Sequence, residues 1–257
     1  MTSNPQKIVG TGSSDFGPSR YGDSFADVYD DWYGDVSDAE ATADFVNRFG
    51  DRQRILELGV GTGRLSTPLA NAGHQVVGVD ASLAMLERFH GVEDPLVSLP
   101  IGADMSALPF AAESFDTVLV ATNTLFNLNA PGAQEQCIAD CRRVLRLGGR
   151  LIVEAMVPAA PDPHLDRLVT TRSLTVDTAV LTATVRDPEV QEITGQHIEI
   201  SEAGIRMRPW KIRYSTPVQL DEIAAAADFR LGDRFADWAE SPFTEDDPNA
   251  VSVYVAV

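Results

Sequence analysis

The sequence has 257 residues, 44% hydrophobic and 23% charged, which suits one large globular domain or one domain with an insertion. No apolar run approaches the roughly 18 residues that a membrane-spanning helix needs, and the first residues lack the pattern of a secretion signal, so we expect a cytoplasmic protein. The net charge of −18 argues against nucleic-acid and membrane partners, because such a surface repels phosphates.

Helix and strand patterns alternate through the first part of the chain. Residues 1–20 are rich in Gly, Ser and Pro and are predicted to be a flexible tail, whereas 21–158 hold N-terminal helices and a doubly wound α/β core. The predicted strands lie at 54–59, 74–80, 95–104, 114–122 and 150–158. The predicted helices between them lie at 37–50, with Ser37 as N-cap, and at 62–73, 81–91 and 131–149.

The pattern changes after residue 158. Residues 159–214 alternate polar with apolar positions, which predicts an inserted antiparallel β ribbon with one packed face and one wet face. Residues 215–257 return to the core with a helix, capped by Thr216 and carrying Pro217 at its first position, and two closing strands. The sequence leaves open whether the ribbon is a lid over the acceptor, a dimer contact, or both.

A glycine-rich loop is the clearest functional signal. The stretch ILELGVGTGRL places Gly59, Gly61 and Gly63 between a strand and a helix, where the absence of a Cβ lets a ligand touch the backbone. Dinucleotide-binding loops carry glycine at the sixth position of this pattern, which is Arg64 here. Asp80 ends the next strand about 20 residues beyond Gly59, where a carboxylate can accept both hydroxyls of a ribose.

This loop resembles the first motif of class I S-adenosylmethionine-dependent methyltransferases. Further stretches resemble later motifs of that family in the same order, among them GADMSALPF, SFDTVLVAT and VLRLGGRLIVE. The resemblance implies a Rossmann-like, seven-stranded methyltransferase sheet with S-adenosylmethionine as cofactor and no metal. It implies that Asp104 accepts from the adenine, Met105 packs on it and Ala121 contacts the methionine end. The cofactor-binding residues that it implies are Glu57, Gly59, Gly61, Gly63, Asp80, Ala81, Met85, Asp104, Met105 and Ala121.

The N-terminal stretch YGDSFADVYDDWY resembles a helix of a subgroup that includes sugar N-methyltransferases of antibiotic biosynthesis. The resemblance implies that Tyr21 sits over the methyl group as a catalytic residue. Tyr29 follows eight residues later, two helical turns away, and is predicted to bind the acceptor at the same mouth, although Tyr29 and Trp32 are equally consistent with simple packing. We therefore expect a small-molecule acceptor from specialised metabolism.

Acceptor-site candidates also follow the fourth strand, because α/β sheets bind ligands at the carboxyl ends of their strands. Asn123 and Phe126 are predicted to bind the acceptor, and Asn127 to act near the transferred methyl. Some relatives carry a histidine or tyrosine at the position of Asn127. Asparagine cannot act as a general base, which favours either a nucleophile that needs no strong base, such as an amine, or a base supplied from elsewhere in the protein.

The ribbon adds a second group of candidates. His197 is predicted as a catalytic base, with Glu199 on the same face, and Arg206 and Arg208 as acceptor-binding residues for a phosphate or carboxylate. The alternative for the two arginines is a solvated face with cross-strand ion pairs.

Three other functions remain open at the level of sequence. The first is an O-methyltransferase, and the second is a cofactor-binding cyclase or scaffold that transfers no methyl group. The third, a nicotinamide-dependent oxidoreductase, is disfavoured by Arg64 and by the absence of a Tyr-x-x-x-Lys pair. The sequence also leaves open whether the protein is a homodimer or a larger homo-oligomer.

Overall fold

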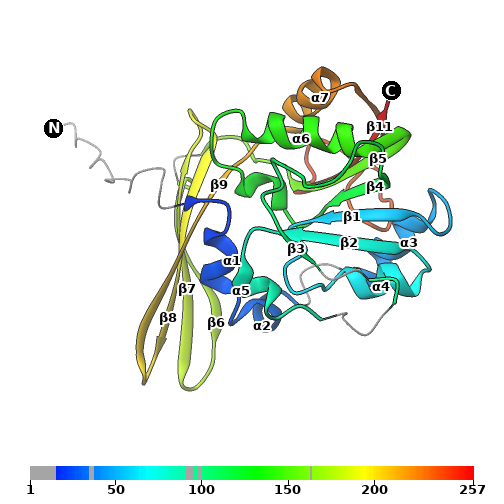
Figure 1. Cartoon of the computed structure of the whole chain (residues 1–257). Helices are drawn as coiled ribbons and strands as arrows, with labels where there is room; N and C mark the ends of the chain where they lie inside the picture. The colour runs from blue at the N-terminus through cyan, green and yellow to red at the C-terminus, as the bar shows by residue number, and fades with distance from the viewer. Residues whose placement is uncertain (1–15, 35–37, 91–94, 98–99, 163) are drawn as a thin grey trace.

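The computed structural model describes residues 16–34, 38–90, 95–97, 100–162 and 164–257. A seven-stranded sheet in the order β10-β11-β5-β4-β1-β2-β3 forms its centre (Figure 1). Strand β11 is antiparallel to both neighbours, and the other pairs are parallel. The strands are β1 Arg54–Leu58, β2 Gln75–Asp80, β3 Ile101–Gly102, β4 Phe115–Val120, β5 Leu145–Met156, β10 Phe229–Phe235 and β11 Asn249–Ala256. The order reverses between β1 and β4, and such a switch opens a crevice at the carboxyl ends of the strands.

Helices cover both faces of this sheet, and side chains alternate between the two faces. Leu56 and Val118 pack in one apolar cluster with α6 and α7, whereas Ile55 and Leu119 pack in another with α3 and α4. The helices are α3 Ala39–Asn47, α4 Ser66–Asn71, α5 Leu83–Leu86, α6 Ala133–Val144 and α7 Pro217–Ala226. In the part of the chain that the structure describes, no helix has both the length and the apolar character to cross a membrane.

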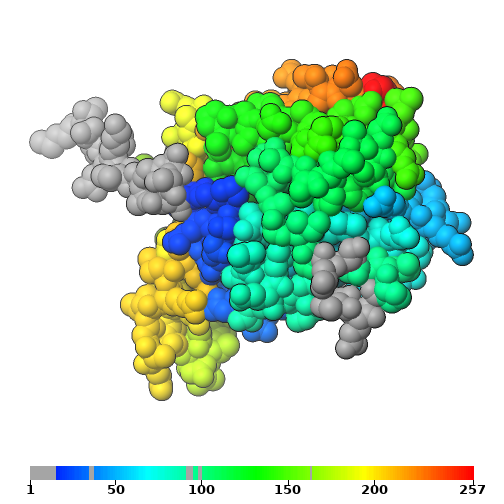
Figure 2. Space-filling model, in the orientation of Figure 1, coloured from blue at the N-terminus to red at the C-terminus, as the bar shows by residue number. Residues whose placement is uncertain are grey.

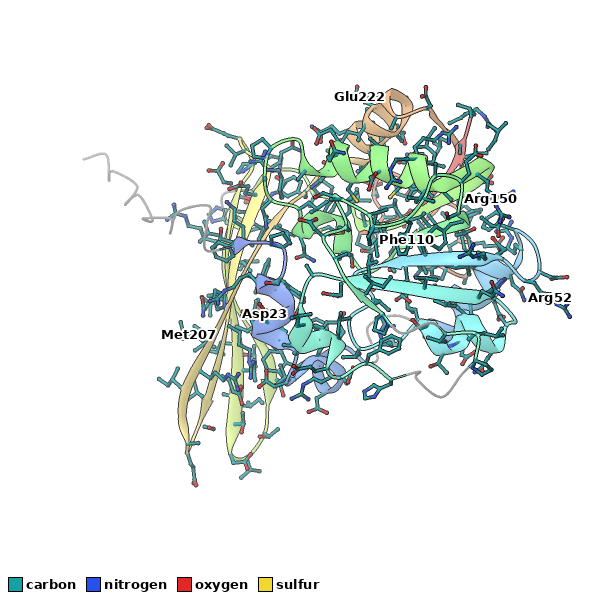
Figure 3. The ribbon with its side chains drawn as sticks, in the orientation of Figure 1. Asp23, Arg52, Phe110, Arg150, Met207 and Glu222 are labelled. Carbon is teal, nitrogen blue, oxygen red and sulfur yellow. The ribbon has the colours of Figure 1, made fainter. Side chains whose placement is uncertain are left out.

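The second sheet is a separate antiparallel ribbon of four strands in the order β6-β7-β8-β9. Its strands are β6 Arg167–Leu174, β7 Thr178–Asp187, β8 Glu192–Ser201 and β9 Gly204–Arg213. Two short N-terminal helices, α1 Arg20–Phe25 and α2 Tyr29–Tyr33, lie between the ribbon and the core (Figures 1 and 2). Phe25 is fully buried there, whereas Met207 lies on the outer side of the ribbon (Figure 3).

Three aspartates fasten this N-terminal segment, residues 20–33, to its surroundings. Asp23 accepts a hydrogen bond of 2.6 Å from the Ser82 hydroxyl, at the start of α5 (Figure 3). Asp30 accepts one of 2.6 Å from the Thr62 hydroxyl of the glycine-rich loop. Asp27 pairs with arginines of β9. The segment therefore bridges the core and the ribbon.

Two predicted elements of the core are shorter in the structure. The helix expected at 81–91 is a single turn, Leu83–Leu86, capped by Ser82. The strand expected at 95–104 is reduced to Ile101–Gly102, with an isolated bridge at Val97. Pro100 precedes that strand and has no N–H to donate to a neighbour, which limits pairing.

The boundary between α6 and β5 also differs from the prediction. The helix ends at Val144, and the strand begins at Leu145 instead of after the two glycines. Leu145 pairs with Phe115 of β4. The register between β4 and β5 then shifts, and pairing resumes at Arg150. Gly148, with φ of 76°, lies in that irregular stretch, so the glycines interrupt a strand and do not end a helix.

The predicted ends of the other elements agree with the structure only in part. Residues 1–15 of the predicted tail and the predicted cap Ser37 lie outside the described residues, and Asp38 caps α3. The capping box at Thr216 and Pro217 at the first position of α7 are confirmed.

Candidate functional site

A cavity of about 430 Å³ opens at the carboxyl ends of β1, β2 and β4, bounded by the N-terminal segment and the ribbon. Its loop end is formed by residues that follow the core strands, principally Gly59, Gly61, Asp80, Met85, Asp104 and Met105. Its ribbon end is formed by residues of α1, the ribbon and the turn after β4, principally Tyr21, Asn127, Arg172, Thr182, His197 and Trp210. Ala81, which is predicted to bind the cofactor, and Tyr29 and Asn123, which are predicted to bind the acceptor, also line it.

The glycine-rich loop shapes the loop end. Gly59, Gly61 and Gly63 have φ of 66°, 56° and 88°, which a side chain would strain. A Cβ on Gly61 would have only Gly59 O and the Tyr29 ring within 4 Å, each at 3.9 Å, and would enter the cavity. A Cβ on Gly63 would instead meet Phe89, so Gly63 serves packing and does not line the cavity.

Two carboxylates line the loop end, and backbone donors orient both. Asp80 accepts from Gly61 N at 3.0 Å and from Ser82 N at 2.8 Å, while burial raises its pKa. Asp104 accepts from the backbone N and the hydroxyl of Ser106, at 2.8 and 2.7 Å. Fixed carboxylates of this kind can accept hydrogen bonds from ligand hydroxyl or amino groups.

A small polar recess adjoins the loop end, beneath the glycines. Glu57, Arg64, Ala121 and Thr122 line it, so Glu57 and Ala121 lie beside the main cavity rather than in its wall. Burial raises the pKa of Glu57 to about 7, although the Ser66 hydroxyl donates to it at 2.8 Å. The sequence reasoning did not assign Arg64 a role, and its place directly after the last glycine is the signal that could have done so.

Tyrosines close the cavity from the N-terminal segment. The ring of Tyr21 stacks on Phe25 with 4.7 Å between centroids. Burial raises the pKa of Tyr21 well above its usual range and that of Tyr29 to about 12. Both phenols therefore keep their protons and can donate hydrogen bonds near neutral pH.

His197 projects from β8 into the ribbon end. Its Nδ1 lies 2.8 Å from the Thr182 hydroxyl, and its ring packs against Phe25, Trp32 and Trp210. Burial, aided by nearby arginines, lowers the pKa of His197 to about 4. The imidazole is therefore neutral at physiological pH and is a weak base.

The turn after β4 is the 3₁₀ helix η2, Thr124–Asn127, and it separates the three candidates that the sequence grouped together. Asn127 and Asn123 line the cavity, and Asn123 Oδ1 also accepts from Met156 N at 2.6 Å. Phe126 is fully buried in the core and does not reach the cavity, so its predicted contact with the acceptor is wrong. Adjacent residues of so tight a turn point to different sides.

Arg206 and Arg208 do not line the cavity, and the prediction that they bind the acceptor does not fit their surroundings. Arg208 is 2% exposed and makes two bonds to Asp27, of 2.6 and 2.9 Å, with Glu199 at 3.3 Å. Arg206 pairs with the same Asp27 at 2.6 Å. These cations are already neutralised, and they hold the N-terminal segment against the ribbon.

Among the residues that the structure describes, no three His, Cys, Asp or Glu side chains gather as metal ligands would. Cys137 and Cys141, the pair one turn apart on α6, are both buried as free thiols.

Comparison with known proteins places this cavity in context. Residues 56–153 match a family model described as a methyltransferase domain, which ends before the ribbon. The chain is 41% identical over 101 residues to a demethylmenaquinone methyltransferase from Renibacterium salmoninarum. That match covers 39% of this chain and only 40% of the relative's length.

Solved structures match over nearly the whole chain. The CcbJ methyltransferase from Streptomyces caelestis is similar with a TM-score of 0.85 and 34% identity, covering 93% of this chain and 99% of that one. The S-adenosylmethionine-bound structure of CalS10, an amino pentose methyltransferase from Micromonospora echinaspora involved in calicheamicin biosynthesis, is similar with a TM-score of 0.65. Its identity is 21%, covering 88% of this chain and 92% of that one, so this likeness concerns the fold.

Proposed function

Because the chain belongs to the S-adenosylmethionine-dependent methyltransferases, we propose that it transfers a methyl group to an amine of a small-molecule acceptor. The cofactor of the family supplies a methyl group activated on a sulfonium. The observation that carries the choice of an amine is the absence of a strong base among the described residues at the ribbon end of the cavity.

The loop end has the donor set for the cofactor. Asp80 would accept from the ribose hydroxyls, Asp104 would accept from the adenine amino group, and Met105 would pack on the adenine. The space that a Cβ on Gly61 would fill supports this fit, since a ligand can approach the backbone there. Arg64 would bind the carboxylate of the methionine end, because the polar recess that it lines adjoins Gly59.

The acid–base character of the ribbon end favours an amine. A hydroxyl acceptor usually needs a general base, whereas a neutral amine attacks without one. His197 has a pKa near 4 and holds a proton poorly, the phenols of Tyr21 and Tyr29 stay protonated, and Asn127 has no basic atom. The hydroxyl of Tyr21 would orient the nucleophile over the methyl group. His197 would accept a hydrogen bond from the nucleophilic amine.

The ribbon and the N-terminal segment would act as the acceptor's enclosure. They contribute the aromatic walls of the cavity, which exclude water from the reacting atoms. We propose the same division for the chain as a whole: 38–158 and 215–257 chiefly for the cofactor, and the N-terminal segment with 159–214 chiefly for the acceptor. The fold shared with an amino pentose methyltransferase supports an acceptor from specialised metabolism.

The test is a pair of measurements on the purified protein. Calorimetric titration with S-adenosylmethionine, S-adenosylhomocysteine and NADH should give micromolar binding of the first two alone. A panel of small amines, each matched with the alcohol of the same skeleton, should then give S-adenosylhomocysteine with amines only. Turnover of the alcohols with a rate that rises steeply with pH would favour the O-methyltransferase, and tight binding with no turnover of any acceptor would favour a scaffold.

A further inference from the structure

Charged side chains are sorted along the cavity. Its carboxylates, Asp80 and Asp104, both lie at the loop end. Arg172, on the ribbon's edge strand β6, is the only lysine or arginine among the described residues of its wall, and it lies at the ribbon end. No carboxylate of the described wall lies at that end. The acceptor therefore meets a cationic and aromatic surface in a protein whose net charge is −18.

The backbone conformation sets the direction in which the side chain of Arg172 points. Thr171 pairs with Leu181 and Ser173 pairs with Val180, so Arg172 is the extra residue of a β-bulge between β6 and β7. Bulges re-aim single side chains and are frequent beside active sites. Without this bulge, the strict alternation of the strand would decide the direction of the side chain.

Aromatic contacts then hold the guanidinium in place. It lies 4.5 Å from the centroid of the Tyr33 ring and 5.2 Å from that of Trp32, and Nη2 donates to Trp32 O at 2.8 Å. Cation–π contacts of this kind fix a guanidinium without neutralising its charge. A guanidinium has several N–H donors, so the carbonyl of Trp32 leaves others available.

Arg172 differs in this respect from most other cations of the ribbon. Arg186, Arg208 and Arg213 each pair with a carboxylate, at 4.0, 2.6 and 3.0 Å, whereas no described carboxylate lies within 4.0 Å of Arg172. Arg167 also lacks such a partner among the described residues, but it lies outside the cavity. A fixed, unneutralised guanidinium in the wall of a cavity is a suitable partner for an anionic oxygen group of a ligand.

We propose that Arg172 binds a carboxylate of the acceptor, so that the substrates of this enzyme are amines that also carry a carboxylate. A single guanidinium matches the single charge of a carboxylate, whereas a diphosphate would call for more than one cation. This inference rests on the proposed function, because it names the class of amine that the ribbon end selects.

The test compares amino acids with their own primary amides, as pairs in which a neutral amide replaces the carboxylate. Binding of each probe to the protein loaded with S-adenosylhomocysteine is followed by calorimetry, and turnover is followed by S-adenosylhomocysteine release. The variants are Arg172→Gln, which removes the charge, and Arg172→Lys, which keeps the charge without the planar fork. Arg167→Gln is the matched control, because Arg167 lies on the same strand but outside the cavity.

We expect the wild type to bind and turn over the carboxylate of a pair about tenfold more efficiently than the amide, as a charge-assisted hydrogen bond predicts. Arg172→Gln should abolish that preference by lowering the efficiency with the carboxylate of each pair to that with its amide, without changing the affinity for S-adenosylhomocysteine. Arg167→Gln should keep the preference, and Arg172→Lys should keep part of it.

Two results would overturn the inference. One is a wild type that makes no distinction within the pairs, either in binding or in turnover. The other is an Arg172→Gln variant that loses carboxylates and amides equally, which would show that Arg172 only supports Trp32. The proposed function fails separately, if no amine of any kind yields S-adenosylhomocysteine.

Discussion

Replacing Asp80 by asparagine should weaken cofactor binding far more than it weakens the fold. The carboxylate accepts from Gly61 N and Ser82 N, and it lines the cavity where a ribose would lie. Asparagine offers one acceptor oxygen, and its NH₂ group would face one of the two backbone donors. The free energy of unfolding should therefore fall by about 1–2 kcal/mol, the cost of one unpaired donor.

The loss in cofactor affinity should be larger, because the ribose hydroxyls would donate to a charged acceptor in the wild type. Losing the charge and one acceptor should cost about 2–3 kcal/mol, which raises the Kd about 30- to 150-fold. Calorimetric titration with S-adenosylhomocysteine measures this change, and urea unfolding followed by tryptophan fluorescence measures the stability.

Asp116→Asn is a matched control. Asp116 also accepts from a backbone donor, Arg54 N at 2.8 Å, but it lies in β4 outside the cavity. This variant should lose comparable stability and leave the Kd within about twofold of the wild type. An Asp80→Asn protein with wild-type affinity would refute the assignment of Asp80 to the ribose. An equal loss in both variants would show that the effect is global.

Three further predictions address other parts of the site. Because the folded state holds the proton of Glu57 up to about pH 7, against 4.5 for the free side chain, wild-type stability should fall as the pH rises through that window. Glu57→Gln should remove this dependence and be about 2–3 kcal/mol more stable than wild type near pH 8 in urea unfolding. Tyr21→Phe should lower kcat about tenfold and leave the Kd for S-adenosylhomocysteine unchanged, and loss of cofactor binding would contradict its role. Gly195→Ala should raise the acceptor KM several-fold without changing cofactor affinity, because the new Cβ would strike the indole of Trp210; kinetics with varied acceptor test this.

The loop end could be predicted because its signals are local. Glycines at 59 and 61 are needed for a close approach to the backbone, and Asp80 ends the next strand of the same parallel sheet. The position of each residue follows from the strand that precedes it. The structure brings Asp80 to the cavity as this reasoning expects, and it also brings Asp104 and Met105 there, which only the resemblance to the methyltransferase family had implied.

The ribbon end could not be predicted in the same way, because its geometry depends on long-range pairing. Alternation along β9 places Arg206 and Arg208 on one face, but only the docking of the N-terminal segment shows that Asp27 pairs with both. The aim of Arg172 depends on a bulge that appears only when β6 and β7 are paired. Local spacing likewise gave no sign that Phe126 turns inward while Asn127 turns outward.

The division of the cavity has a consequence for how such an enzyme diversifies. In the proposed function, the cofactor would contact loops of the core, and the acceptor would contact a ribbon and two helices that lie outside the core sheet. Substitutions in these two sets should combine additively where they do not touch. Natural drift or laboratory libraries confined to the ribbon can therefore explore new acceptors while the capacity to bind the methyl donor is inherited intact.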